Sequence, residues 1–483
     1  HLLSRRQRQM CIRDRYIIML FCLMVGMYSC YDDDTTSGRK EVSLLTITAA
    51  HDTLTTSFGE ELVVNHLKIE QSGEELPLTY EWAYGDLDIS GGAVKPYPIK
   101  DTLHVVSTDP ELKYAFRELG TFALRLKVDN GETTIFKFFI LQIDTEFSEG
   151  ITILSRDDAG KGRLSFMKTL TKEEISGGKV PTFRTDIMEI ANPGMELENV
   201  TDMIQQGGRL MVSSGSNGRI YNMDSRSFDI ETATSFGGKF PGANIQQFVA
   251  ISAYSNMHVL SENKRAYVYE TDVDELLVLD AFDGLEVDAG VSHSKPVFIN
   301  YGTSTMYAPS TSSGAVNSGT IFTNYDIVNA CFINTYLYVF STDKNDPLHI
   351  YIPRTSASFA KPTAANTVDY QSSQPIGMDR NSMTVGTKVY NCIYYTYNNE
   401  IYRWDPGRQL PTTPSITVPT GMEITTIAVD PDQKLLYVGL YESGSTKELK
   451  GCLYIYDADS GELLETYDNI ADRPVRVIYK ERV

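Results

Sequence analysis

The chain has 483 residues, of which 42% are hydrophobic and 22% charged, and its formal net charge at pH 7 is −20. This length exceeds one ordinary domain and fits two or three. An acidic surface repels the phosphate backbone of nucleic acids and anionic lipid headgroups, so nucleic-acid partners are excluded. The 29 Tyr, 20 Phe and 35 Gly residues favour strands and tight turns over helices.

The amino-terminal residues read as processing signals rather than as part of a fold. Residues 1–15 are rich in Arg and resemble translated read-through from a sequencing adapter, so we leave them out of the fold prediction. The apolar segment 16–29 is too short to span a bilayer and has the length of a signal-peptide core. Its end, Ser29 before Cys30, resembles the lipobox of bacterial lipoproteins. The resemblance implies lipidation of Cys30 and a lipid anchor in the outer membrane.

Acidic residues follow this cysteine almost directly, at Asp32, Asp33 and Asp34. They resemble the surface-export signal of Bacteroidetes lipoproteins, which implies exposure on the cell surface. Residues 30–41 are polar and contain Gly38, so they are expected to form a flexible acidic tether.

Residues 42–146 contain short runs in which apolar and polar residues alternate, and about seven such strands predict a β-sandwich. Because alternate residues of a strand share a face, Phe122, Leu124, Leu126 and Val128 are expected on one side of a sheet. Tyr80 and Trp82 share a face in the same way.

The stretch from Tyr80 to Asp86, with Trp82 and Gly85 between them, and the later strand that starts at Gly120 resemble a PKD domain. The sequence departs from that family where Leu87 follows Asp86 in place of the usual Gly. The resemblance implies an immunoglobulin-like β-sandwich that acts as a spacer or adhesion unit.

A strand that ends at a polar corner recurs through residues 147–483. Corner residues of this kind are Asp224, Asp280, Asp405 and Asp457. Recurrence at intervals of about fifty residues is typical of propeller blades, so the pattern predicts an all-β fold with a six- or seven-bladed β-propeller in this region. A helical or mixed domain is the rival, and its best candidate helix is the short segment Asn199–Gln206.

Two features bear on the ring. The segment 296–326 is irregular and rich in Ser, Thr and Gly, so it is either a loop insertion or a seventh blade, and six blades are slightly favoured. The last strand, residues 473–480, has no unit of its own, and the first unit lacks an innermost strand before Ile151. Pairing the two would close the ring and remove its exposed edges.

The order of these parts resembles the PKD-like lipoproteins of gut Bacteroidetes. The resemblance implies a surface lipoprotein that captures glycans or other nutrients together with a TonB-dependent outer-membrane transporter and a lid lipoprotein.

Common catalytic motifs are absent from the sequence: it contains no Gly-x-Ser-x-Gly, no His-Glu-x-x-His and no Walker loop. His258, His293 and His349 lie near predicted strands and are expected to be hydrogen-bonded strand residues. The acids Asp272, Asp274 and Glu275 fit a solvated hairpin turn better than a calcium site. We therefore expect no metal, no cofactor and no enzymatic activity.

Binding is the favoured function because sugar rings stack on aromatic faces and propeller loops are rigidly held. The loop tyrosines available for stacking are Tyr254, Tyr301, Tyr307, Tyr370 and Tyr441. One alternative is a polysaccharide-cleaving hydrolase or lyase whose paired carboxylates come from different blades. The other is a structural or adhesion protein.

Overall fold

The computed structural model describes residues 42–57, 61–88, 95–99, 102–116, 118–249, 257–278, 282–292, 295–309 and 315–483. Residues 1–41 lie outside these ranges, and with them the predicted read-through, the signal peptide, Cys30 and the tether acids Asp32, Asp33 and Asp34. The chain divides between Ile143 and Asp144 into two compact units. In the described part of the chain, no helix is both long and apolar enough to cross a membrane.

The first unit, here the amino-terminal unit, is built from antiparallel strands in one six-stranded sheet and two two-stranded sheets. The large sheet has the order β2-β10-β9-β5-β6, with β7 also paired to β5, and the small sheets are β1-β4 and β3-β8. The bounds are β1 Leu45–Thr48, β2 Thr53–Ser57, β3 Glu61–Val64, β4 Lys68–Gln71, β5 Thr79–Asp88, β6 Lys95–Pro98, β7 His104–Ser107, β8 Leu112–Ala115, β9 Gly120–Asp129 and β10 Thr134–Asp144.

The core of this unit follows the predicted alternation. Leu124, Leu126 and Val128 are fully buried on one face of β9, and Phe122 packs against the same cluster. Trp82 is also fully buried, and its indole Nε1 donates to the carbonyl of Asp109 at 3.1 Å. The predicted shared faces are therefore confirmed for this β region, because burial of one side of each strand selects every second residue.

The second unit contains seven further antiparallel sheets, which we number as blades 1 to 7. Blade 1 has β39 Arg473–Lys480, β11 Gly150–Arg156, β12 Lys161–Lys168 and β13 Phe183–Arg184, with the short β14 Leu197–Glu198 also paired to β12. Its connections carry the helices α2 Lys172–Ser176 and α3 Ile187–Ala191. Blade 2 has β15 Val200–Gln206, β16 Arg209–Ser214, β17 Arg219–Asp224 and β18 Ile230–Ser235.

The remaining blades each have four strands. Blade 3 has β19 Ile245–Val249, β20 Met257–Ser261, β21 Ala266–Glu270 and β22 Glu275–Val278, and blade 4 has β23 Ala289–Val291, β24 Val297–Asn300, β25 Thr305–Pro309 and β26 Ala315–Asn317. Blade 5 has β27 Tyr325–Ile333, β28 Tyr336–Asp343, β29 His349–Thr355 and β30 Thr367–Gln371, preceded by the 3-10 helix η5 Ala364–Asn366. Blade 6 has β31 Thr384–Thr387, β32 Cys392–Tyr397, β33 Glu400–Trp404 and β34 Ile416–Thr417, and blade 7 has β35 Glu423–Val429, β36 Leu435–Tyr441, β37 Gly451–Asp457 and β38 Leu463–Ala471.

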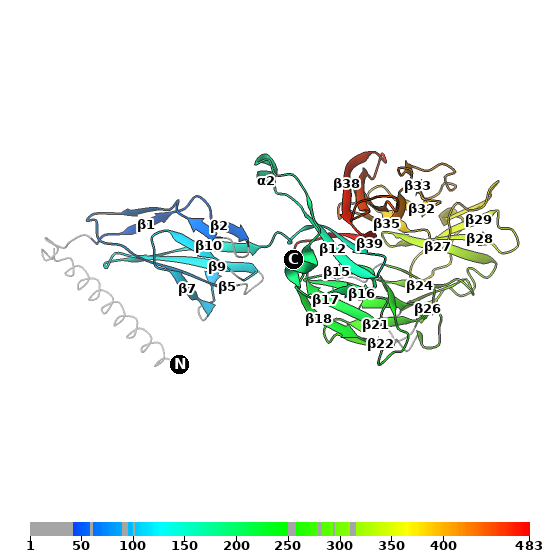
Figure 1. Ribbon diagram of the computed structural model, residues 1–483, viewed down its shortest axis with the longest axis horizontal. Coiled ribbons are helices and arrows are strands. Elements are labelled where there is room, and N and C mark those ends of the chain that lie inside the picture. Colours follow the sequence, from blue (N-terminus) through cyan, green and yellow to red (C-terminus); the bar gives the residue numbers. More distant parts are fainter. Residues whose placement is uncertain are drawn as a thin grey trace, which may run out of the picture. The chain divides into compact units, whose positions relative to one another are not determined.

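These sheets form a closed β-propeller. The first strand of each blade lies beside the first strand of the next, from β39 through β15, β19, β23, β27, β31 and β35 back to β39. Figure 1 shows the red carboxy-terminal strand β39 beside the green strands that begin the ring. Its pairing with β11 places Tyr479 opposite Ile151 and Arg476 opposite Leu154, so the predicted closure is confirmed.

The structure corrects the favoured blade number and decides against the rival helix. The ring has seven blades rather than the favoured six, because residues 297–317 supply three strands of blade 4. Those strands are only three to five residues long, so their alternation is too brief to stand out. The candidate helix Asn199–Gln206 is instead β15, the inner strand of blade 2, whose hydrogen bonds to β16 outweigh the short helical pattern.

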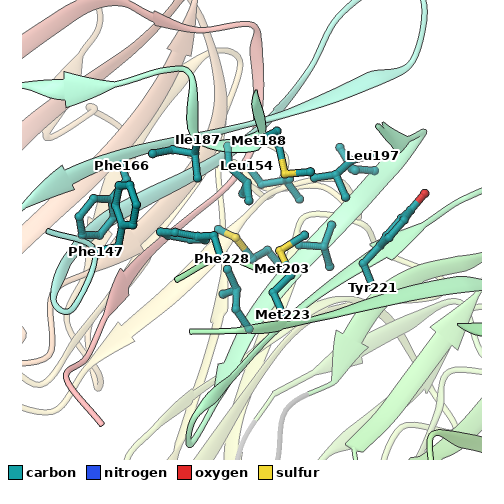
Figure 2. Close-up of a cluster of buried hydrophobic side chains, with 14 residues drawn as sticks. Phe147, Leu154, Phe166, Ile187, Met188, Leu197, Met203, Tyr221, Met223 and Phe228 are labelled. Atoms are coloured by element: carbon teal, nitrogen blue, oxygen red, sulfur yellow. The ribbon is translucent and has the colours of Figure 1, made fainter. Parts of the chain in front are cut away.

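A large apolar cluster fills the space between blades 1 and 2. Figure 2 shows Phe147, Phe166 and Phe228 toward one end of this cluster and Tyr221 at the other, with Met203 and Met223 between them. The three Phe rings pack edge to face with centroids 5.4–5.6 Å apart. This core fixes the two blades against each other beneath the loops described next.

Candidate functional site

One end of the propeller carries the loops that lead into the inner strands and the loops between second and third strands. We call this end the upper face. In blade 1 the antiparallel registers bring Arg156, Lys161 and Arg473 to this end, because Arg156 lies opposite Arg473 and β12 begins there. Most of the polar groups considered below lie on the upper face.

A cavity of about 260 Å³ opens on the upper side of blade 1. Charged side chains line it, namely Asp157, Lys161, Arg163, Glu189, Glu196 and Asp472. They come from β12 and the turn before it, from α3 with the loop after it, and from the residue just before β39. The cavity is therefore completed only when the last strand closes the ring.

Ion pairs hold the walls of the cavity in place. Lys161 Nζ lies 2.8 Å from Glu196 Oε1, and this hydrogen bond raises the pKa of Lys161. Arg163 Nε donates to Asp472 Oδ2 at 2.8 Å, and its Nη1 donates to the carbonyl of Thr185 at 3.1 Å. Both ion pairs are charge-assisted hydrogen bonds, which are stronger than neutral ones, so they hold the wall residues in position.

The turn below the cavity is fixed by backbone hydrogen bonds. Asp157 Oδ1 accepts from the N–H groups of Ala159 at 2.9 Å and Lys161 at 2.8 Å. Gly162 follows, where a Cβ atom would lie 2.6 Å from Val200 Cγ1 and 2.8 Å from Leu197 Cβ. Only glycine lets β12 approach the segment from Leu197 to Val200 this closely. A larger residue at position 162 would push that segment away from β12.

The floor of the cavity is apolar. Met188 and Leu197 line it and also belong to the cluster between blades 1 and 2, where Figure 2 shows them together at its upper edge. Since that cluster is buried and closely packed, the cavity stands on a rigid base.

A second polar group lies next to the cavity at the seam between blades 7 and 1. Arg473 Nη1 lies 2.8 Å from Glu423 Oε2, and the pair lowers the pKa of Glu423. The Arg473 guanidinium also lies 5.2 Å from the ring centroid of Tyr441. This contact connects the predicted tyrosine Tyr441 to the cavity wall, since Arg473 directly follows the lining residue Asp472.

Tyr301 also lies on the upper face, in the loop between β24 and β25, but its ring is already covered. It is only 9% exposed, and the Arg380 guanidinium lies 4.7 Å from its ring centroid. Its N–H donates to Asp288 Oδ2 at 2.8 Å. Burial raises the pKa of Tyr301 to about 12, as expected for a phenol held in the protein interior.

The other predicted tyrosines do not join these groups. Tyr307 lies within β25, with its ring centroid 6.3 Å from that of Phe282. Tyr370 lies on the outer strand β30, where its hydroxyl accepts from the N–H of Leu410 at 3.1 Å. Tyr254 lies outside the described residues.

One carboxylate on an inner strand, that of Asp202, connects neighbouring blades. Asp202 on β15 accepts from the N–H of Phe248 in blade 3 at 2.8 Å and lies 3.4 Å from Arg476 Nε on β39. Burial raises the pKa of Asp202, while the nearby Arg476 opposes that shift. This carboxylate therefore connects three neighbouring blades.

Asp274, one of the acids weighed as a calcium site, is used structurally. Asp274 accepts hydrogen bonds from Tyr269 and Asn222 with Oδ1, at 2.8 and 3.0 Å, and from Thr232 with Oδ2 at 2.8 Å. The network joins blades 2 and 3. Across the part of the chain that the structure covers, no group of three or more His, Cys, Asp or Glu is placed to hold a metal ion.

The sequence patterns missed the cavity. Arg163 and Asp472 are 309 residues apart, and neither lies in a recognisable motif. The available signal was local: the Asp157 to Gly162 turn combines acids and glycines at the end of a strand. Its partner residues could be identified only from the closed ring.

The comparisons with known proteins assign no family to this chain. No family model matches it, and no curated protein matches its sequence. Among solved structures, it is similar to a quinonprotein alcohol dehydrogenase-like protein from Bacteroides thetaiotaomicron, with 15% identity over 90% of this chain and 97% of that chain and a TM-score of 0.48. It is also similar to a DUF4784 family protein from Bacteroides caccae, with 8% identity over 91% and 100% of the two chains and a TM-score of 0.34.

The Dos1 propeller is a third similar structure, with 11% identity over 68% of this chain and 87% of that chain and a TM-score of 0.40. At these identities and TM-scores the matches carry nothing about function. The protein is an all-β chain in which an amino-terminal β region precedes a seven-bladed β-propeller, while the resemblance to the PKD-like family stays a prediction.

Proposed function

We propose that this protein is a non-catalytic lipoprotein of the cell surface that binds a glycan or another nutrient at the upper face of blade 1. The observation that carries the proposal is the 260 Å³ cavity, whose charged walls are already held by ion pairs. A site whose polar groups are held before binding loses little side-chain entropy when a ligand enters. Ligand pockets usually combine a partly apolar wall with a few fixed polar groups, as this one does.

The size of the cavity favours a small polar unit. Pockets for drug-sized ligands span about 300 to 1,000 Å³, so this one suits a single sugar residue rather than an extended chain. The carboxylates of Glu196 and Asp472 can accept from hydroxyl groups, while Lys161 and Arg163 donate to ring or hydroxyl oxygens. Tyr441 is outside the lining residues, and its ring contacts Arg473, the residue that follows Asp472 of the wall.

The hydrogen bonds of the wall carboxylates support binding without catalysis. Glycoside hydrolysis needs a pair of carboxyl groups that flank the scissile bond and react with it. Glu196 and Asp472 each bond to a cation of the wall, and Asp157 accepts two backbone N–H groups. These three carboxylates therefore hold the walls of the cavity together.

The cellular setting is part of the same proposal and rests on the amino-terminal sequence pattern. Lipidation of Cys30 would anchor the protein in the outer membrane, and the acids Asp32, Asp33 and Asp34 would direct it to the surface. There it would pass its ligand to a TonB-dependent transporter with a lid lipoprotein. Replacing Cys30 with Ser should abolish fatty-acid labelling in cells, and intact cells treated with protease should lose the wild-type protein.

Isothermal titration against a panel of plant and host glycans tests the binding function. We expect at least one ligand, and we expect Lys161→Ala to weaken it by about tenfold because a charged hydrogen-bond donor is lost. Lys172→Ala is the matched control, since Lys172 is an exposed lysine on α2 outside the cavity. Release of cleaved product from any bound glycan would show an enzyme, and silence across the panel would overturn the proposal.

A further inference from the structure

Strand β10 of the amino-terminal unit turns large apolar side chains outward as well as inward. Its inward residues include Phe139, Leu141 and Ile143, which are almost fully buried. Phe136 and Phe138 come earlier in the strand and, by its alternation, face the other side of the sheet; Phe136 is 46% exposed. A single exposed apolar residue is ordinary, whereas a patch of several marks an interaction site, so the neighbours of Phe136 on this face decide its meaning.

A third aromatic residue joins this face. Tyr97 of β6 is 53% exposed, and its ring packs edge-on against Phe138 with centroids 5.2 Å apart. Phe136 and Phe138 lie nearly parallel, with 21° between their planes and 6.3 Å between their centroids. We call Tyr97, Phe136 and Phe138 the aromatic stripe.

Polar side chains border the stripe on both sides. On β9, Lys127 lies opposite Phe136 and Arg125 lies opposite Phe138, and Arg125 forms an ion pair with Glu81 of β5. The Arg125 guanidinium lies 5.6 Å from the Phe136 ring centroid. On the other side of β10 is β2, whose sequence is mostly Thr and Ser.

The side chains that separate the exposed apolar groups decide between classes of occupant. Val105 of β7 is 59% exposed on the same face, but the charged Arg125 of β9 lies between it and Phe138. A stable protein interface needs about 800 Å² from each partner and an apolar centre, which apolar groups divided by a charged side chain do not supply. A polysaccharide stacks its sugar rings on separate aromatic side chains with hydrogen-bonding groups alongside, and Tyr97 and Phe136 offer two such rings, inclined to each other.

We propose that the aromatic stripe is a second carbohydrate-binding surface, which holds an extended polysaccharide chain by stacking sugar rings on Tyr97 and Phe136. The inference rests on the proposed function, which places a sugar-sized site on the propeller. Arg125, Lys127 and Glu81 hydrogen-bond the hydroxyl groups of the bound chain. Binding a polysaccharide at two places on one protein raises the overall affinity through effective concentration.

The test uses the full chain with only Cys30 replaced by Ser, and a polysaccharide that binds the wild type in the glycan panel. The double variant Tyr97→Ala with Phe136→Ala is compared with Tyr336→Ala, a matched control at a tyrosine that is 47% exposed on the propeller. We expect the double variant to bind the long polysaccharide about tenfold more weakly and a short oligosaccharide of the same sugar unchanged. Phe136→Tyr should keep the wild-type affinity, because it retains the aromatic face.

The outcomes separate this inference from the proposed function. If the wild type binds the polysaccharide and the double variant binds it equally well, the stripe is not a carbohydrate surface, although the binding function stands. If the wild type binds no glycan at all, both proposals fail. If sedimentation shows a wild-type dimer that the double variant abolishes, the stripe is an interface between two copies of the chain, and the inference is overturned.

Discussion

Blades 1 and 4 of the propeller are built in opposite ways. Blade 1 has long strands of seven or eight residues in β11, β12 and β39, and the pairing of β11 with β39 joins residues more than 300 positions apart, such as Ile151 and Tyr479. Blade 4 has strands of three to five residues from one continuous segment. Closing the ring at blade 1 has a larger chain-entropy cost, so strong packing is needed there, whereas blade 4 is held between completed neighbours.

The same contrast appears in two buried basic side chains. Lys480, at the end of β39, is fully buried, and its Nζ donates to the carbonyl of Ser148 at 3.0 Å. Its ammonium lies 5.4 Å from the ring centroid of Phe166 and 5.5 Å from that of Phe228. His258 of blade 3, which packs against Phe298 of blade 4, has no hydrogen-bond partner for either ring nitrogen among the described residues. The buried ammonium of Lys480 thus has a hydrogen-bond partner where β39 closes the ring. The buried ring of His258, between blades 3 and 4, has none among the described residues and is neutral.

The largest expected effect comes from removing β39, the strand that closes the ring. A chain that ends at Asp472 lacks β39, which exposes the edge of β11 and part of the core of blade 1. We expect the propeller to lose its cooperative unfolding transition and to aggregate. Fluorescence of the buried Trp404 reports on the propeller alone when Trp82 is replaced by Phe. A chain that lacks only residues 481–483 is the control, and a truncated propeller with an unchanged transition would show that closure is dispensable.

Matched core truncations sharpen the comparison. Phe166 and Phe298 are 2% and 0% exposed, so the lost apolar surface is similar. We expect Phe166→Ala to lower the free energy of unfolding by about 4 kcal/mol and Phe298→Ala by about 3 kcal/mol, both within the usual range for such changes. The difference arises because Phe166 also faces the Lys480 ammonium. Urea denaturation measures both, and a larger loss at Phe298 would contradict the distinction between the blades.

Because Lys480 is buried, we expect the free energy of unfolding to change with pH in the alkaline range. Burial lowers its pKa from 10.5 to about 8, so between these values the unfolded chain binds more protons than the folded one. Stability attributable to this group therefore rises with pH across that window, by up to roughly 3 kcal/mol. The difference in unfolding free energy between wild type and Lys480→Met, measured from pH 7.5 upward, isolates this group from the tyrosines. A flat difference would show that the ammonium is retained throughout.

His258 predicts a smaller change on the acid side. Burial lowers its pKa from 6.5 to about 4, so the neutral ring contributes its full stability above pH 6.5. That contribution is lost as the pH falls toward 4, because the unfolded chain takes up the proton first. We expect a loss of about 2 kcal/mol relative to His258→Gln over this window, less than the full shift would give because His258 is still 8% exposed. Equal acid sensitivity of the two proteins would show that His258 is protonated without cost.

Histidines also mark the limits of sequence interpretation. His349 is a hydrogen-bonded strand residue as expected, with its Nε2 2.5 Å from Asp369 Oδ1. His258 was expected to behave alike and does not, because hydrogen-bond partners depend on which side chains a neighbouring blade presents. His293 lies outside the described residues.

Three features could be predicted from the sequence alone. They are the all-β class, the shared faces of β5 and β9, and the pairing of β39 with β11, the first strand of the propeller along the chain. Each depends on alternation within a strand or on an unpaired strand at a chain end, and both are local properties of the chain. The seventh blade, the strand at Val200–Gln206 and the cavity of Arg163 and Asp472 were decided by the tertiary structure. Short strands gain their stability from neighbouring sheets, and residues 309 positions apart meet only because the ring closes, so neither leaves a periodic signal in the sequence.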